Sequence, residues 1–375
     1  MPGASGIPEL INNHSADLRL FKKRRISPGR NRLFCVHVKN ALQVCHLHSL
    51  RTGWAVTQRS SPAYHEILKD GKGCVWVLTE TQVVLIGGDA RQLEVIQKLL
   101  ELDAGVQLIG FDNLQMPING AARVKLTAEV LEKADVLILP AVGTDDAGKV
   151  ESVFGTEELV LTRELVAALP KHAKIFTGMA KNYLRELCKE EGIRLVEMFD
   201  RDDVAIFNSI PTAEGAIMMA IQHTDFTIHG SVSMVLGIGR TGLTMARTLK
   251  GLGAHVKAGV RKPEDYARAW EMGFQPFYTR DLIAQVQDVD FLFNTVPAPI
   301  VTAQVIAHIP HRALIIDLAS RPGGTDFRFA EKRGVKAMLA PGLPGIVAPK
   351  TAGKIIAKTV ADILMEDIVK GGNAP

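Results

Sequence analysis

Aromatic residues and cysteine are scarce in this sequence. Its 375 residues include three Trp, four Tyr and four Cys, and aromatic side chains make up 6% of the chain. The cysteines form no repeated Cys-x-x-Cys pair, so we expect neither a disulfide scaffold nor a structural zinc site. No apolar run reaches the roughly 18 residues that a membrane-spanning helix needs. We therefore expect no bound metal and no membrane association.

The hydrophobic share of 47%, with 22% charged residues, is typical of a globular protein, and the length suggests two domains. The net charge of +4 is unevenly distributed. Residues 1–76 contain 12 Lys and Arg against four acids, so the remaining 299 residues carry a net charge of −4. The net negative charge of residues 77–375 argues against nucleic-acid binding.

Residues 1–76 also differ from the rest in pattern. They include the basic cluster Lys22-Lys23-Arg24-Arg25 but no sustained helical or alternating apolar period. No apolar signal segment follows the cluster, and no aromatic stacking pattern accompanies it. We interpret this segment as a basic, irregular extension that is poorly ordered or not part of the native protein, with Val77 as an alternative first residue.

From residue 77 onward, short apolar strands alternate with helices. An apolar strand at 83–86 ends in Gly87-Gly88-Asp89-Ala90-Arg91, and an amphipathic helix and a second strand at 106–110 follow. The same pattern returns with a strand at 232–236 and a glycine turn at 237–242. This alternation predicts an α/β protein with two Rossmann-like, doubly wound parallel-sheet domains joined by crossover helices.

The second glycine turn matches the Gly-x-Gly-x-x-Gly pattern of dinucleotide-binding folds. Gly237 allows the tight turn, Gly239 lets the backbone approach a pyrophosphate, and Gly242 lets helix and strand pack closely. We therefore predict that the whole turn binds a cofactor, with Arg240 facing the pyrophosphate or solvent: Gly237, Ile238, Gly239, Arg240, Thr241 and Gly242. A merely glycine-rich turn is the alternative.

The first glycine turn departs from this pattern. It places Asp89 at the second glycine position and Gln92 at the third. Because a carboxylate repels a phosphate, we expect a Rossmann-like domain that has lost nucleotide binding and faces the substrate.

The strand after the second turn ends in Arg261-Lys262-Pro263, where NAD-dependent enzymes carry an acid. Two cations at this point favour NADP, with Arg261 over the 2′-phosphate and Lys262 assisting; an exposed loop pair is the alternative. Residues at the ends of the later strands are further candidates for cofactor contact: Asn294, Thr295, Val296 and Ser320. Asp317 either joins them or caps the following connection.

Two joints connect the predicted domains. Residues 208–215 precede a short helical run at 216–222, and residues 341–351 lead back to a terminal helix at 352–370. We place the substrate domain at 77–211, completed by the terminal helix, and the NADP domain at 212–351. Clefts between domains often bind small ligands, so Glu214 and Lys350 are site candidates.

Five segments together resemble the dipicolinate synthase A-subunit family of spore-forming bacteria: residues 86–91, 208–216, 228–231, 237–242 and 343–353. The resemblance covers 77–375. It implies an NADP-dependent oxidation of a cyclic dihydro- or hydroxytetrahydro-dipicolinate to dipicolinate (pyridine-2,6-dicarboxylate), in the cytoplasm of the mother cell. It also implies a second, flavoprotein-like subunit, and we expect a homo-oligomer.

For such a substrate, two carboxylates need cations. Arg91 and Lys350 are the leading pair, with Arg321 third and Thr212 as a further substrate contact. Asp89 and Glu214 are the candidates for proton transfer, because burial in a cleft can raise the pKa of a carboxyl group.

Several alternatives remain open. Arg91 could instead pair with Glu94 on the helix surface. The protein could be another two-domain NAD(P)-dependent dehydrogenase acting on an amino acid or a hydroxy acid, or a non-catalytic NADP-binding subunit.

Overall fold

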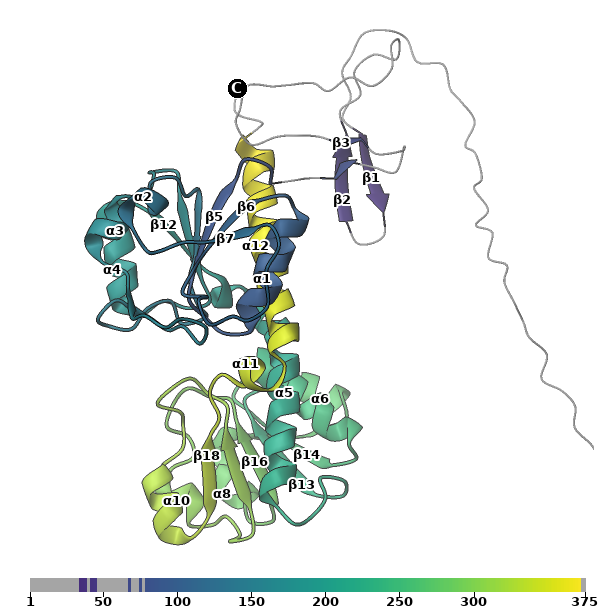
Figure 1. Cartoon of the computed structure of the whole chain (residues 1–375). Helices are drawn as coiled ribbons and strands as arrows, with labels where there is room; N and C mark the ends of the chain where they lie inside the picture. The colour runs from purple at the N-terminus through teal and green to yellow at the C-terminus, as the bar shows by residue number, and fades with distance from the viewer. Residues whose placement is uncertain (1–33, 39–40, 46–66, 69–73, 76–77, 372–375) are drawn as a thin grey trace, which may run out of the picture. The chain divides into compact units, whose positions relative to one another are not determined.

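The computed structural model describes the backbone of residues 34–38, 41–45, 67–68, 74–75 and 78–371, and side chains within 78–368 (Figure 1). The chain divides into two units, of which the smaller covers 1–55 and 68–74. Strands β1 (Phe34–Val38) and β2 (Ala41–Cys45) pair antiparallel in it, and β3 (Ile67–Leu68) pairs with β4 (Cys74–Val75). These strands lie within the extension that the sequence predicts to be irregular. The basic cluster and Val77 lie outside the described residues.

The first large sheet has six parallel strands in the order β12-β11-β8-β5-β6-β7. One face packs on helices α1 (Arg91–Glu101) and α12 (Pro349–Gly371), and the other on α2 (Ala128–Leu131), α3 (Arg163–Ala167) and α4 (Asn182–Glu191). Because both faces are covered, the inner strands are largely apolar. The strands are β5 (Gln82–Ile86), β6 (Gly105–Ile109), β7 (Ala121–Arg123), β8 (Val136–Ile138), β11 (Lys174–Thr177) and β12 (Arg194–Glu197). The short strands β9 (Lys149–Val150) and β10 (Leu159–Val160) pair antiparallel beside it.

The second large sheet repeats this topology in the order β15-β14-β13-β16-β17-β18. Its strands are β13 (Val232–Leu236), β14 (His255–Val260), β15 (Gln275–Tyr278), β16 (Phe291–Asn294), β17 (Leu314–Asp317) and β18 (Lys336–Leu339). Its helices are α6 (Arg240–Gly251), α7 (Pro263–Glu271), α8 (Leu282–Gln285), α9 (Ala303–Ile306) and α10 (Phe327–Arg333). Counted from its first strand, each sheet reads 3-2-1-4-5-6, the order of dinucleotide-binding domains. The predicted fold class is confirmed.

The joint after the first sheet is one continuous helix, α5 (Asp202–His223), rather than a loop followed by a short helix. Pro211 lies inside it, although a proline removes one helical hydrogen bond. The same helix packs closely on the short helix α11 (Leu343–Val347): a Cβ on Gly215 would lie 3.1 Å from Val347 and 3.2 Å from Leu343. The boundary predicted at 211 and 212 therefore falls inside a helix.

The terminal helix α12 begins at Pro349, three residues before the predicted start. Proline suits the first helical position because its missing N–H would be unpaired there. Ile356, Val360 and Leu364 of α12 join the core of the first sheet, and α12 runs beside α1 (Figure 1). Lys350 consequently lies in the first turn of a helix and not in a preceding joint.

Helix α5 is also the one helix within 78–371 that is long and apolar enough to cross a membrane. The sequence reading missed this because Asn208, Thr212 and Glu214 interrupt the apolar run. The best 18-residue window has a mean hydropathy of 1.4, and 39% of it is buried in the protein. Length and composition alone are weak evidence for a membrane span, since core helices meet the same criteria.

Candidate functional site

The glycine turn after β13 is tight at its ends and open in its middle. Gly237 has a φ of +86°, and a Cβ on Gly242 would overlap the Gly237 carbonyl oxygen. A Cβ on Gly239, in contrast, would meet no atom within 4 Å. The turn thus leaves open space at the N-terminus of α6, where backbone N–H groups favour an anion. These residues fit the pyrophosphate of a dinucleotide.

The segment after β16 supports this turn from the adjacent strand. The Thr295 hydroxyl donates a hydrogen bond to the Leu236 carbonyl at 2.8 Å. Asn294 is fully buried, and its amide donates to the carbonyl of Val296 at 3.1 Å and to Asp317 at 3.0 Å. The polar side-chain atoms of Asn294 and Thr295 are therefore engaged in bonds within the protein.

Asp317, at the end of β17, is a fully buried carboxylate. Besides the Asn294 amide, it accepts hydrogen bonds from the Ala319 N–H, the Gly324 N–H and the Thr325 hydroxyl, at 2.7 to 3.0 Å. Of the two roles left open by the sequence, the contacts support the local one, because Asp317 fixes the loop that follows it. Ser320 and Arg321 are exposed on that loop.

Cations follow the second and third strands of the second sheet. Arg261 and Lys262 follow β14, and both are exposed. The Lys262 Nζ lies 3.8 Å from a carboxylate oxygen of Glu264. Among the described side chains, Arg261 forms no ion pair. Val260 at the end of β14 pairs with Tyr278 at the end of β15, so the two strands end side by side. Arg280 comes just after β15, and its guanidinium lies 4.5 Å from the centre of the Tyr278 ring. The sequence reading missed Arg280, although a cation just after the third strand was a usable signal.

Arg240, in the glycine turn, forms an ion pair with Asp202 at 3.0 Å. From the sequence, the Arg240 side chain could face either the pyrophosphate or solvent. Its partner lies in the first turn of α5, so this contact connects the glycine turn to that helix.

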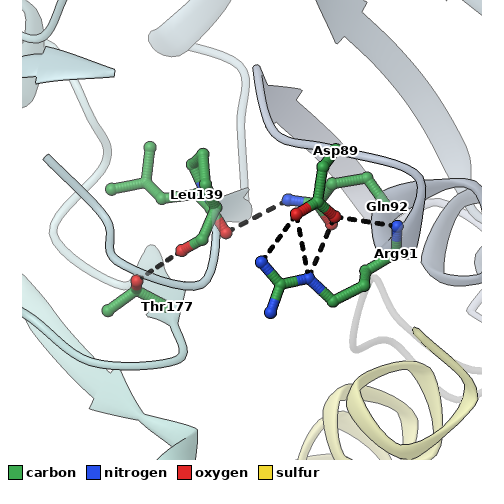
Figure 2. A network of polar contacts seen from close by, with 6 residues as sticks. Asp89, Arg91, Gln92, Leu139 and Thr177 are labelled. Carbon is green, nitrogen blue, oxygen red and sulfur yellow. Dashed lines mark hydrogen bonds and ion pairs between the residues drawn. The ribbon is translucent and has the colours of Figure 1, made fainter. Parts of the chain in front are cut away.

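In the first sheet, Asp89 and Arg91 bind each other (Figure 2). The Arg91 Nη2 donates to Asp89 Oδ2 at 2.6 Å, Nε donates to both carboxylate oxygens at 2.9 and 3.1 Å, and the Arg91 backbone N–H donates to Oδ1 at 2.9 Å. The side chains are 19% exposed for Arg91 and 34% for Asp89. Arg91 does not pair with Glu94, the alternative partner considered from the sequence.

This pairing reverses the expected pKa shift of Asp89. Burial acts to raise its pKa, but the hydrogen bonds and the positive charge of Arg91 together outweigh burial and leave the pKa below its ordinary value. The expectation of a raised pKa is wrong for this state because the sequence did not reveal that Asp89 and Arg91 would be partners.

The first glycine turn begins like the second. Gly87 has a φ of +61° and donates its N–H to Ile109 at 2.9 Å, as Gly237 donates to Gly259. The difference is Gln92, which is buried and donates to the Leu139 carbonyl at 3.1 Å. A Cβ on Gly88 would lie 2.5 Å from the Gln92 side chain. Side chains fill the space that the second turn leaves open.

A small hollow lies at the carboxyl ends of β5, β8 and β11, next to the Asp89–Arg91 pair. The Thr177 hydroxyl donates a hydrogen bond to the Pro140 carbonyl at 2.7 Å (Figure 2). Together with the hydrogen bond from Gln92 to the Leu139 carbonyl, it holds the segment after β8 beside the Asp89–Arg91 pair. The hollow is lined by Asp89, Arg91, Gln92, Leu139, Pro140, Ala141, Gly178, Met198 and Ile356.

The structure does not bring Lys350 to Arg91. Lys350 is exposed and lines a separate groove between α1 and α12, together with Glu94, Gln97, Lys98, Glu101, Lys354 and Lys358. It lies there because α12 already begins at Pro349, so Lys350, Lys354 and Lys358 share a helical face. What approaches Arg91 is Gly345 of α11: a Cβ at this position would lie 2.9 Å from the guanidinium carbon. The sequence carried no signal for this close approach.

The two candidates on α5 occupy different environments. Glu214 is exposed in the middle of the helix. Thr212 is half-buried, and its hydroxyl donates to the Asn208 carbonyl one turn earlier, at 2.7 Å. Neither residue lines the hollow beside Asp89 and Arg91. Within the described part of the chain, no group of three or more His, Cys, Asp or Glu side chains is arranged to hold a metal ion.

The two matching sheets and the open glycine turn define a two-domain Rossmann-type protein with a dehydrogenase-like fold. The transhydrogenase of Sinorhizobium meliloti shares this fold: its structure matches with a TM-score of 0.57 at 17% identity, over 76% of this chain and 94% of that one. At this identity the likeness concerns the fold alone.

The family is given by more similar sequences. The family model for the N-terminal domain of the dipicolinate synthase A subunit matches residues 82–199. The dipicolinate synthase A subunit of Bacillus subtilis (strain 168) is 50% identical over 290 residues, which are 77% of this chain and 98% of that protein. The crystal structure of the Bacillus halodurans A subunit matches with a TM-score of 0.75 at 50% identity, over 77% and 99% of the two chains. The chain therefore belongs to the dipicolinate synthase A-subunit family.

Proposed function

We propose that this protein is the dehydrogenase subunit of a dipicolinate synthase. It oxidises a cyclic dihydrodipicolinate to dipicolinate, with transfer of a hydride to NADP and release of a proton; a hydroxytetrahydro substrate would lose one water in addition. The observation that carries this proposal is the difference between the two glycine turns, each of which follows the first strand of its sheet. One leaves open space for a dinucleotide at Gly239, and the other holds the Asp89–Arg91 pair. The activity in the name of the 50% identical relative supports the product.

The residues Gly237 to Gly242 would hold the pyrophosphate of the cofactor, and a bound nicotinamide would supply a two-electron acceptor. Thr295, Val296 and Ser320 follow β16 and β17, at the carboxyl edge where ligands bind in such sheets. The preference for NADP is supported by the cations after β14 and β15, which offer charge for a 2′-phosphate: Arg261, Lys262 and Arg280.

Arg91 is the proposed receptor for one substrate carboxylate. It begins helix α1, whose N-terminal N–H groups also favour an anion. A substrate carboxylate can replace Asp89 on the guanidinium, because both present two oxygens to the same donors. The displaced Asp89 then loses the contacts that lower its pKa and becomes the better proton acceptor for the oxidation.

The remaining candidates have weaker support. Arg321 is exposed on the loop that Asp317 fixes and is our choice for the second substrate carboxylate. Thr212, Glu214 and Lys350 retain their proposed roles only if substrate binding moves them toward the hollow, since none of them lines it.

The relative is named as one subunit of a synthase, which implies a partner subunit. We propose that the partner is a second, flavoprotein-like synthase subunit, that this chain forms a homo-oligomer, and that the enzyme is located in the cytoplasm of the mother cell.

A single-turnover experiment tests this function. The full chain is mixed with NADP and freshly generated cyclic dicarboxylate, and NADPH absorbance and the ultraviolet absorbance of the pyridine product are followed together. Equal amounts of both products support the proposal. NADP binding without reduction indicates a non-catalytic subunit, and reduction by an amino acid or a hydroxy acid alone indicates a different dehydrogenase.

A further inference from the structure

The backbone of α11 lies against the flat face of the Arg91 guanidinium. A Cβ on Gly345 would lie 2.9 Å from the central guanidinium carbon, 3.1 Å from Nε and 3.2 Å from Nη1. Because the guanidinium is planar, a point that is nearest to its central carbon and slightly farther from two of its nitrogens lies above the plane. Gly345 thus covers one face of the guanidinium and leaves its edges to hydrogen-bond acceptors.

The edges of the guanidinium are unequally occupied. Nε and Nη2 of Arg91 donate to Asp89 (Figure 2). Nη1 donates no hydrogen bond to any group in the part of the chain that the structure describes. Arg91 therefore retains a donor for a ligand, and the face that lies on Gly345 sets the plane in which this donor points.

The backbone at Gly345 does not itself require glycine. Its φ is not positive, and glycine forms helices less readily than alanine. The three atoms nearest to a Cβ at this position all belong to the Arg91 side chain. A side chain at position 345 would therefore disturb Arg91 before any other group.

Helix α11 is held in place from its other side. Leu343 is 4% exposed, and both Leu343 and Val347 lie against Gly215 of α5. The Arg91 side chain, in contrast, is long and has several rotatable bonds. A methyl group at position 345 would consequently move the guanidinium of Arg91 rather than α11.

We propose that Gly345 is a positioning residue for Arg91: its bare backbone holds the guanidinium in the plane from which it binds a substrate carboxylate. This inference rests on the proposed function of Arg91 as the carboxylate receptor. Two parallel hydrogen bonds between a guanidinium and a carboxylate require that the groups share a plane, so a tilt of the guanidinium weakens the contact. The inference extends the substrate site to α11, which packs on the crossover helix α5.

The first measurement requires no ligand. Burial acts to raise the pKa of Asp89, and the contacts with Arg91 outweigh it. In Gly345→Ala the displaced guanidinium contacts Asp89 less well, so the pKa of Asp89 should rise toward its ordinary value. The carboxyl carbon signal of Asp89 in an NMR titration of the full chain reports this change. Gly251→Ala, at the end of α6, adds the same methyl group to open space and is the matched control.

The second measurement uses dipicolinate as the ligand in titration calorimetry. Gly345→Ala should weaken its binding by about 10-fold or more, because a small misplacement of a bidentate group is costly. Gly251→Ala should bind dipicolinate normally, and NADP affinity should not change in either variant. When Gly345→Ala is added to Arg91→Gln, it should change the affinity by less than about twofold, because the shorter side chain no longer reaches the methyl group.

The results distinguish failure of this inference from failure of the proposed function. If Arg91→Gln binds dipicolinate as tightly as the unmodified chain, Arg91 is not the carboxylate receptor, whereas a raised Asp89 pKa in Gly345→Ala still supports the positioning of Arg91 by Gly345. An unchanged Asp89 pKa, or normal dipicolinate binding by Gly345→Ala where Arg91→Gln binds weakly, would overturn the inference.

Two further results would also contradict it. Equal weakening by Gly345→Ala with and without Arg91 would indicate a general disturbance of the fold. Thermal unfolding should give similar melting temperatures for Gly345→Ala and Gly251→Ala, because only the far end of a side chain has to move. A Gly345→Ala variant that fails to fold would show that α11 moves instead of Arg91.

Discussion

Asp89 and Arg91 are two residues apart and bind each other through four hydrogen bonds, three to the guanidinium and one to the backbone N–H. The pair occupies the turn position that is left open at Gly239 in the second sheet. The two turns begin alike but differ from this position on: Gly239 leaves open space, whereas Asp89 holds the Arg91 guanidinium.

Asp89→Asn should unmask Arg91. The neutral amide competes less well for the guanidinium, so we expect the product dipicolinate to bind about 10-fold more tightly, a gain of about 1.4 kcal/mol, while kcat falls. Titration calorimetry and steady-state kinetics measure the two effects. Unchanged product affinity would show that Asp89 does not compete with the ligand.

Arg91→Gln should have the opposite effect on binding. Loss of a buried charged contact costs about 2–4 kcal/mol in kcat/KM, with little change in NADP affinity. Lys350→Gln is the matched control, since Lys350 is exposed in a separate groove. Equal losses in both variants would mean that the two cations meet at one ligand after all.

Arg261→Ala should weaken NADP selectively. A charge-assisted contact contributes about 1.5–3 kcal/mol, which corresponds to a roughly 10- to 150-fold change in affinity, and NAD affinity should not change. Arg280→Ala should show a smaller effect of the same kind. Fluorescence titration with both nucleotides checks this. Equal weakening of NAD and NADP would exclude a role in reading the 2′-phosphate.

Two glycine variants separate cofactor binding from folding. Gly239→Ala adds a methyl group to open space, so the melting temperature should hardly change while cofactor affinity falls. Gly242→Ala forces a methyl group onto the Gly237 carbonyl oxygen, and overpacking of this kind costs about 1–3 kcal/mol or more. Thermal unfolding without cofactor distinguishes them; a stable Gly242→Ala variant would contradict this geometry.

Asp317→Asn should reduce the stability of the fold, because Asp317 is buried and holds the loop that follows β17. The amide can accept fewer of the four hydrogen bonds that the buried carboxylate receives, and we expect a loss of about 2–4 kcal/mol in the free energy of unfolding. Urea unfolding measures it. Asp326→Asn, at an exposed helix cap, is the control with an expected loss of about 1 kcal/mol or less.

Cys188 should be inert at neutral pH and affect stability only in alkali. Burial, aided by the charge of Glu197, raises the pKa of its thiol from 9.0 to about 11. The folded protein favours the neutral thiol, so this contribution is fully present below pH 9.0 and is lost as the pH rises through about 11. Iodoacetamide at about pH 8, followed by peptide mass spectrometry, should leave Cys188 unmodified until denaturant is added. Rapid labelling of the native protein would contradict its burial.

The sequence by itself determined the fold class and the position of the open glycine turn. Both depend on local rules: apolar strands of four to six residues, glycines at fixed spacing, and helices with one apolar face, as at β13 and α6. Glycine positions follow from backbone geometry within a few residues, so Gly237 and Gly242 could be assigned their roles before any tertiary contact was known.

Only the tertiary structure decided which charged groups meet. Asp89 and Arg91 form a pair, and Lys350 lies in a different groove, because the start of α12 at Pro349 sets the face on which Lys350 lies. Helix α5 continues through Pro211 and packs at Gly215 against α11, which is more than 120 residues away in the chain. Long-range packing of this kind has no local signature, since it arises where distant segments exclude water together. The pKa of Asp89 and the place of Glu214 both follow from it.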